Sequence, residues 1–168
     1  MAAADLLTAL RLPLAVAFVL RPEAETRLAI LAVAAASDLA DGWLARRIGG
    51  SRFGAFLDPV ADRLFMAAAF AVVLFSGVLA WWEVLLVVLR DLLAALAFFV
   101  SLAGRRPRAI PARAGGKVVT LLQVVTLAAF VWQSRFLQPL AWATAAVGLY
   151  AIYDYARAVP TESRPLGA

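Results

Sequence analysis

Four aspartates lie close together in the sequence between two long apolar runs: Asp38, Asp41, Asp58 and Asp62. The first two are three positions apart and the last two are four apart, spacings that place both side chains of a pair on one side of a helix. One ionised aspartate at the centre of a bilayer costs about 2.5–3.5 kcal/mol on insertion scales, so four without partners would cost on the order of 10 kcal/mol. The pattern therefore predicts that cations gather these carboxylates.

A hard divalent metal ion suits such a set of oxygen ligands. The chain contains no cysteine and no histidine, which excludes disulfides, thiolate chemistry, histidine acid/base catalysis and the zinc sites built from those side chains. Oxygen ligands without nitrogen or sulfur favour magnesium first, then manganese or calcium. Four carboxylates are enough to bridge two ions about 4 Å apart, an arrangement that clamps the attacking and leaving oxygens in phosphoryl chemistry. We therefore predict two Mg²⁺ ions, with Mn²⁺ as an alternative.

Glycines among the aspartates favour a phosphate-binding function, because a phosphate or sugar can approach the backbone closely where no side chain stands. They are Gly42, Gly49, Gly50 and Gly54. In a reading without metal, Asp58 is a helix N-cap followed by Pro59 at the first helical position, and the first two aspartates form ion pairs with Arg46 and Arg47. We favour the metal site, since several ionisable residues within an apolar chain usually mark function.

The composition predicts that membrane lipid surrounds the chain. Of its 168 residues, 64% are hydrophobic and the mean hydropathy is +0.87, more than a soluble core of this size could bury. The net charge is +5, but the basic residues fall between apolar runs rather than along one face, which argues against nucleic acid as a partner. No polar stretch is left over for a soluble domain, so residues 1–168 are predicted to form one transmembrane domain.

The apolar runs predict an all-α integral membrane protein with six transmembrane helices, each requiring about 20 residues to cross the bilayer. The runs cover residues 6–20, 28–44, 64–82, 84–102, 118–132 and 136–153. The first run is interrupted by Arg11 and Pro13, so we expect its beginning to lie along the membrane surface. Tyr155, near the end of the last run, is predicted to be an anchor at that surface.

Basic residues predict the orientation of the helices. Two connections, after the second and fourth runs, contain clusters of them: Arg46, Arg47, Arg52, Arg105, Arg106, Arg108, Arg113 and Lys117. The third connection contains none. Because basic residues favour cytoplasmic loops, we predict a multi-pass protein of the cell (inner) membrane with both termini and the aspartate site on the cytoplasmic side. The metal site then lies between the second and third helices near that face.

The spacing around the aspartates resembles the signature of a known enzyme family. The stretch reads Asp38-x-x-Asp41-Gly42-x-x-Ala45-Arg46 and, after seven residues, Gly54-x-x-x-Asp58-x-x-x-Asp62. It resembles the signature of the CDP-alcohol phosphotransferases at every fixed position, and eight specified positions in fixed order make the motif specific. Residues 5–13 are similar to the family's opening Asn-x-x-Thr-x-x-Arg segment, with Asp5 in place of the asparagine.

The resemblance implies a metal-dependent transfer of a phosphatidyl group from CDP-diacylglycerol to an alcohol, with release of CMP. By position in the motif, Asp38, Asp41 and Asp58 would be metal ligands. Asp62 would share metal binding with abstraction of the proton from the acceptor hydroxyl. The residues implied in binding the CDP-lipid are Gly42, Ala45, Arg46, Gly54, Thr8 and Arg11. Family members are often homodimers, so a homodimer is expected here.

A second group of polar residues is predicted to bind the acceptor. Arg90 lies in the middle of the fourth run beside Asp91. Residues 112–123, which lead into the fifth run, contain Arg113, Lys117, Thr120 and Gln123. This pattern is similar to that of the phosphatidylglycerophosphate synthases and related cardiolipin synthases. It implies glycerol 3-phosphate as the acceptor, ahead of phosphatidylglycerol and inositol phosphate, bound by Arg90, Arg113 and Lys117. Alternatively, Arg90 pairs with Asp91 or an active-site carboxylate, and Lys117 only anchors its helix at the membrane surface.

Two other classes of function would use the same residues differently. A divalent-cation channel or carrier would place the carboxylates in a transport site, and a structural membrane subunit would not need them. The sequence shows no inverted repeat with a second acidic cluster, and arginines flank the aspartates where a cation path would avoid them. We therefore favour the enzyme.

Overall fold

The computed structural model describes residues 3–48, 52–103 and 114–158, and side chains at residues 10–38, 40, 60–97, 100 and 116–157. These residues form six α-helices: α1 (Ala3–Leu20), α2 (Ala24–Ile48), α3 (Arg52–Ser76), α4 (Trp81–Ala103), α5 (Ala114–Val131) and α6 (Leu137–Ala158). The predicted all-α fold with six helices is confirmed. Among the described residues, no helix combines the length and the apolar character needed to cross a membrane.

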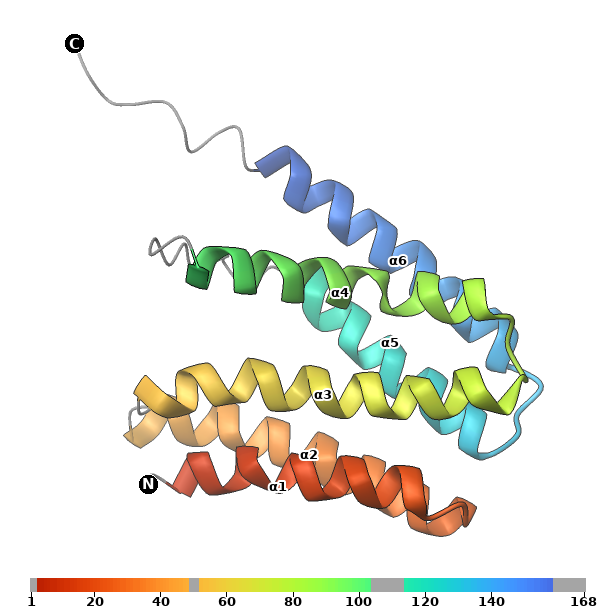
Figure 1. Ribbon diagram of the computed structural model, residues 1–168, viewed down its shortest axis with the longest axis horizontal. Helices are drawn as coiled ribbons and strands as arrows, with labels where there is room; N and C mark the ends of the chain where they lie inside the picture. Colours follow the sequence, from red (N-terminus) through yellow and green to blue (C-terminus); the bar gives the residue numbers. More distant parts are fainter. Residues whose placement is uncertain (1–2, 49–51, 104–113, 159–168) are drawn as a thin grey trace.

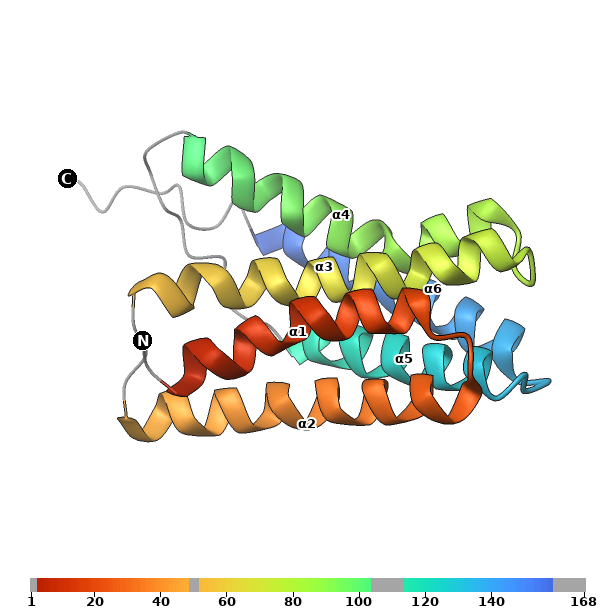
Figure 2. The same ribbon diagram turned by 60° about the horizontal axis from the view of Figure 1, so that its bottom comes forward.

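Successive helices run in opposite directions, so α1, α3 and α5 begin at the same end of the molecule at which α2, α4 and α6 end (Figure 1). α1 packs against both α2 and α3 (Figure 2), while α5 and α4 both pack against α6. The hydroxyls of Thr126 in α5 and Thr144 in α6 are 3.0 Å apart and completely buried. This hydrogen bond satisfies two polar groups within the contact between those helices.

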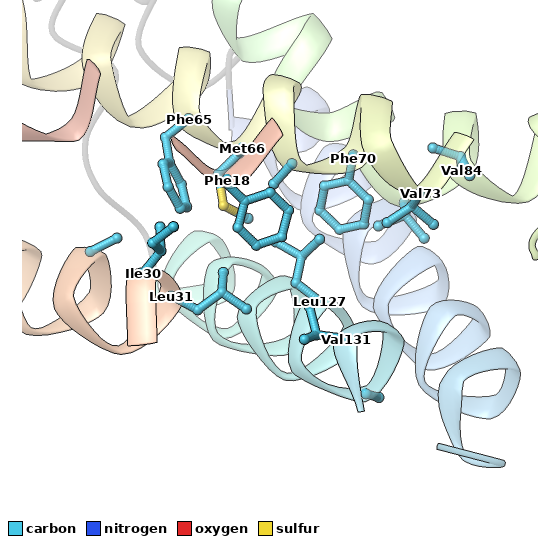
Figure 3. Packing of buried hydrophobic residues seen from close by; sticks show 14 of the residues in the cluster. Phe18, Ile30, Leu31, Phe65, Met66, Phe70, Val73, Val84, Leu127 and Val131 are labelled. Carbon is cyan, nitrogen blue, oxygen red and sulfur yellow. The ribbon is translucent and has the colours of Figure 1, made fainter. Parts of the chain in front are cut away.

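Aromatic and aliphatic side chains from all six helices form one core (Figure 3). Phe18 and Phe65 meet edge to face with their ring centroids 6.2 Å apart, a favoured arrangement of aromatic rings. Phe70 and Leu127 are buried beside them. Arg11 and Asp62 precede Phe18 and Phe65 in their helices by one or two turns, so the core fixes where these polar residues lie along α1 and α3.

The third helix ends earlier than the sequence predicted. Gly77 adopts a φ of +70°, the left-handed conformation that ends many helices and that glycine adopts without a steric penalty. Ala80 then donates its backbone N–H to Glu83 Oε2 at 2.9 Å, which caps the beginning of α4. The predicted end of the run 64–82 is therefore wrong. The residues after Gly77 are also apolar, so the hydrophobic pattern gave no sign of the turn.

The first helix has no break at its polar and proline residues. α1 runs continuously from Ala3 to Leu20 with Pro13 inside it. Arg11 is only 2% exposed, so its side chain faces other helices. The helix thus continues past Arg11 and Pro13, and the expectation that its beginning lies along the membrane surface stays a prediction.

Candidate active site

An ion pair between a buried arginine and a half-exposed aspartate joins α1 to α2. Arg11 Nη2 donates to Asp38 Oδ1 at 2.9 Å, and the two side chains are 2% and 54% exposed. A buried guanidinium requires a carboxylate of this kind, because an uncompensated buried charge is strongly destabilising. The pair therefore fixes Asp38 relative to α1. The sequence had suggested Arg46 or Arg47 as alternative partners for Asp38, and it had not predicted Arg11.

Asp62, in α3, lies at the centre of the charged residues. It is partly buried, and the carboxylates of Asp38 and Asp91 repel it while the guanidinium groups of Arg11 and Arg63 attract it. These neighbours come from α1, α2, α3 and α4. Charged groups from four helices therefore act on Asp62 together.

Both aspartate pairs lie within single helices, as the spacing predicted: Asp38 and Asp41 in α2, Asp58 and Asp62 in α3. The side chains of Asp41, Asp58, Thr8, Ala45 and Arg46 lie outside the described part of the structure, as do the surroundings of Gly42 and Gly54. Arg113 lies outside it entirely. Over the side chains that are described, no three acidic residues form a group that could hold a metal ion. The four-carboxylate metal site therefore stays a prediction.

A polar cavity of about 230 Å³ opens between α3, α4, α5 and α6. Its charged lining residues are Asp62, Arg63, Arg90, Asp91 and Lys117. Three cations against two carboxylates leave the cavity with an excess of positive charge, which favours an anionic ligand. The cavity thus brings the predicted acceptor residues Arg90 and Lys117 together with Asp62, the predicted base.

Hydrogen bonds from α4 and α5 hold Arg90 in the wall of this cavity. Arg90 Nη1 donates to Asp91 Oδ1 at 2.8 Å. Gln123 Nε2 donates to the other carboxylate oxygen of Asp91 and, at 3.1 Å, to the backbone carbonyl of Val87. Both oxygens of Asp91 are therefore occupied, and Asp91 serves to orient Arg90. The ion pair between Arg90 and Asp91 that the sequence offered as an alternative is confirmed, and Arg90 still lines the cavity.

We expect replacement of Gln123 by leucine to lower the stability of the protein. Gln123 is 1% exposed, and its loss leaves one oxygen of Asp91 and the carbonyl of Val87 without this donor. An unsatisfied buried polar group costs about 1–3 kcal/mol, and a charged one costs more. Thermal unfolding in detergent should show a clearly lower Tm for Gln123→Leu. Gln133→Leu is the control, because Gln133 is exposed in the turn after α5. Equal Tm changes in the two variants would contradict the prediction.

Sequence reasoning gave no role in this cavity to Arg63, Gly116 or Tyr155. Tyr155 was predicted to be an anchor at the membrane surface. The structure places all three in the cavity lining, a place that the prediction for Tyr155 did not include. Its hydroxyl lies 3.5 Å from where a Cβ at Gly116 would be, a contact between α5 and α6 that no local pattern reveals.

Comparison with known proteins adds an independent finding. Residues 1–150 match the family model described as CDP-alcohol phosphatidyltransferase. The chain is similar to the "Probable phosphatidylglycerophosphate synthase" of Mycobacterium tuberculosis (strain H37Rv), with 39% identity over 104 residues, which are 61% of this chain and 48% of the relative. It is also similar to the "CDP-diacylglycerol--glycerol-3-phosphate 3-phosphatidyltransferase" of Escherichia coli (strain K12), with 38% identity over 109 residues, 62% of this chain and 59% of the relative. The match thus spans about half to three fifths of these relatives.

Proposed function

We propose, since the chain belongs to the CDP-alcohol phosphatidyltransferase family, that it transfers a phosphatidyl group from CDP-diacylglycerol to glycerol 3-phosphate and releases CMP. The names of the Mycobacterium tuberculosis and Escherichia coli relatives support this choice of reaction and acceptor. The observation that carries the proposal is the cavity that combines Asp62 with Arg63, Arg90 and Lys117. It offers a carboxylate base beside a group of cations that suits a phosphorylated alcohol.

The acceptor phosphate would lie against Arg90 and Lys117. Within the described part of the chain, Nε of Arg90 is buried and has no hydrogen-bond partner, and an oxygen of a bound phosphate would supply one. An arginine fork matches phosphate oxygens in geometry and charge. With the phosphate held there, Asp62 takes the proton of the attacking hydroxyl, a role that requires it to be within hydrogen-bond reach of that hydroxyl.

The CDP-lipid is proposed to bind toward α1 and α2, against Gly42, Ala45, Arg46, Gly54, Thr8 and Arg11. The ion pair of Arg11 with Asp38 supports an added role for Arg11, which is to orient the carboxylate of Asp38. We also propose that Arg113 binds the acceptor alcohol, because it belongs to the same sequence pattern as Lys117.

We further propose that Asp38, Asp41, Asp58 and Asp62 hold two magnesium ions, with manganese as the alternative. Membership of a family that generally depends on metal supports this. So does the electrostatic repulsion between Asp38 and Asp62, since carboxylates that repel each other suit a shared hard cation. When bound, such ions stabilise the charge that develops on the transferred phosphoryl group.

We propose a multi-pass location in the cell membrane, with the termini and the active site on the cytoplasmic side. Several large apolar side chains are highly exposed, among them Phe75 at 86%, Trp132 at 75% and Leu20 at 70%, which is unusual for a surface in water. The family is one of membrane enzymes.

Two further expectations stay predictions. They are that residues 1–168 form a single domain and that the enzyme is a homodimer.

The proposal is tested with purified protein, magnesium and CDP-diacylglycerol, offered glycerol 3-phosphate, phosphatidylglycerol or inositol phosphate in separate reactions. We expect release of CMP with glycerol 3-phosphate at a rate at least about tenfold higher than with the others, because a site built for a particular polar group rejects analogues that leave it unpaired. Protein that consumes no CDP-lipid with any acceptor, yet passes divalent ions into liposomes, would instead support the transport alternative.

A further inference from the structure

We infer that Gly116 positions Arg90 for the acceptor, because its missing side chain leaves the space in which the guanidinium lies. This inference rests on the proposed function of the cavity. A Cβ at Gly116 would lie 2.4 Å from Arg90 Nη2 and 3.4 Å from its Cζ. Non-bonded heavy atoms are most stable about 3.5–4.0 Å apart, so an alanine and the present guanidinium cannot share this place.

Arg90 cannot make room for an alanine without changing its present orientation. Its Nη1 is held by Asp91 at 2.8 Å, and Asp91 is held in turn by the buried amide of Gln123. Because a guanidinium is rigid and planar, Nη2 can leave this place only if the whole group shifts or turns about Nη1, and either movement changes the direction in which the guanidinium faces the cavity. Three residues therefore set the position of the Arg90 guanidinium. Gly116 leaves space for it, and Asp91 and Gln123 hold it through hydrogen bonds.

The displacement should affect the acceptor more than the CDP-lipid. Arg90 lies in the cavity wall beside Lys117, where the phosphate is proposed to bind, whereas the CDP-lipid is proposed to bind toward α1 and α2. A misplacement of about 1 Å can cost 10²-fold in rate. For Gly116→Ala we expect kcat/KM for glycerol 3-phosphate to fall about 10- to 100-fold, mainly through KM, while KM for CDP-diacylglycerol changes less than about twofold.

Gly148 provides a matched control in α6. A Cβ there would lie 3.9 Å from the Cβ of Arg90, an ordinary van der Waals contact. Gly148→Ala therefore makes the same chemical change in a helix beside the same arginine but leaves the guanidinium in place. We expect its kinetic constants to stay within about twofold of the wild type. Since alanine favours a helix more than glycine does, neither substitution weakens its helix by propensity.

A double-mutant cycle separates positioning from a general effect on α5. Lysine lacks the Nη2 atom, so in an Arg90→Lys background Gly116→Ala should cost less than about threefold in kcat/KM for glycerol 3-phosphate, against tenfold or more in the wild type. An equal cost in both backgrounds would overturn the inference. So would a loss in Gly148→Ala as large as that in Gly116→Ala.

Calorimetric titration with inorganic phosphate tests the positioning role of Gly116 without depending on the proposed reaction. We expect Gly116→Ala to bind phosphate about tenfold more weakly than the wild type, which corresponds to the loss of one well-placed contact. If the wild type releases no CMP but shows this difference in phosphate binding, the reaction is wrong and the positioning role stands. If the wild type releases CMP and both measurements are unchanged in Gly116→Ala, the positioning role is wrong and the reaction stands.

Discussion

Asp62→Asn should reduce the release of CMP by about 10³-fold or more, since a general base contributes 10²- to 10⁴-fold and this residue is also a proposed metal ligand. Asparagine keeps the shape of the side chain but can neither accept the proton of the acceptor hydroxyl nor supply a negative charge. Its neighbours Asp38 and Asp91 repel the native carboxylate, so the amide introduces no new electrostatic repulsion with them. The rate of CMP release with glycerol 3-phosphate is the measurement, together with the Tm in detergent.

Glu83→Gln is the matched control for the loss of a carboxylate. Glu83 is 7% exposed and lies at the beginning of α4, at the end of the molecule opposite to the beginning of α1 (Figure 1). It accepts the backbone N–H of Ala80 at 2.9 Å, a bond that a glutamine oxygen can also accept. We expect less than about a threefold change in rate for this variant. Substantial activity in Asp62→Asn, or an equal loss in Glu83→Gln, would contradict the role of Asp62.

The local pattern of the sequence was sufficient for the helices and for the placement of the four aspartates. Apolar runs and spacings of three or four residues are properties of neighbouring positions, and they predicted six helices with Asp38 and Asp41 in one and Asp58 and Asp62 in the next. The same kind of pattern was misleading at Gly77. There the apolar residues on both sides of the turn continued the hydrophobic run, although the backbone reverses.

The contacts that shape the site could not be predicted, because they join residues that are distant in sequence. Arg11 and Asp38 are separated by 27 positions, and their pairing depends on how α1 packs against α2. Gln123 reaches Asp91 across 32 positions. The close approach of Arg90 to Gly116 likewise depends on the packing of α4, α5 and α6. The sequence indicated such contacts only through the types of three residues within or beside apolar runs: a glycine, a glutamine and an arginine. A polar side chain there requires a partner, and a glycine there usually has a packing or functional role.

Removal of divalent ions should abolish CMP release, and magnesium should restore it. Metal ions supply several kcal/mol of charge stabilisation in phosphoryl transfer, which corresponds to about 10³-fold or more in rate. Arg11 and Arg63 are the cations whose charge acts on Asp62, and Arg11 is already paired with Asp38. The proposed metal ions would supply the further positive charge that the reacting phosphoryl group requires. The measurement is the rate after dialysis against a chelator, then with magnesium, manganese, calcium or sodium added back at equal ionic strength.

Thermal unfolding tests the same metal site without relying on turnover. A ligand that binds only the folded protein raises its stability, by about 2.7 kcal/mol at a concentration one hundred times its Kd, so magnesium should raise the Tm of the wild type. Asp38→Asn and Asp62→Asn each remove one proposed ligand and should reduce that rise, whereas Glu83→Gln should not. Full activity after chelation, or an equal magnesium-induced rise in Tm in all four proteins, would show that these carboxylates do not hold the metal.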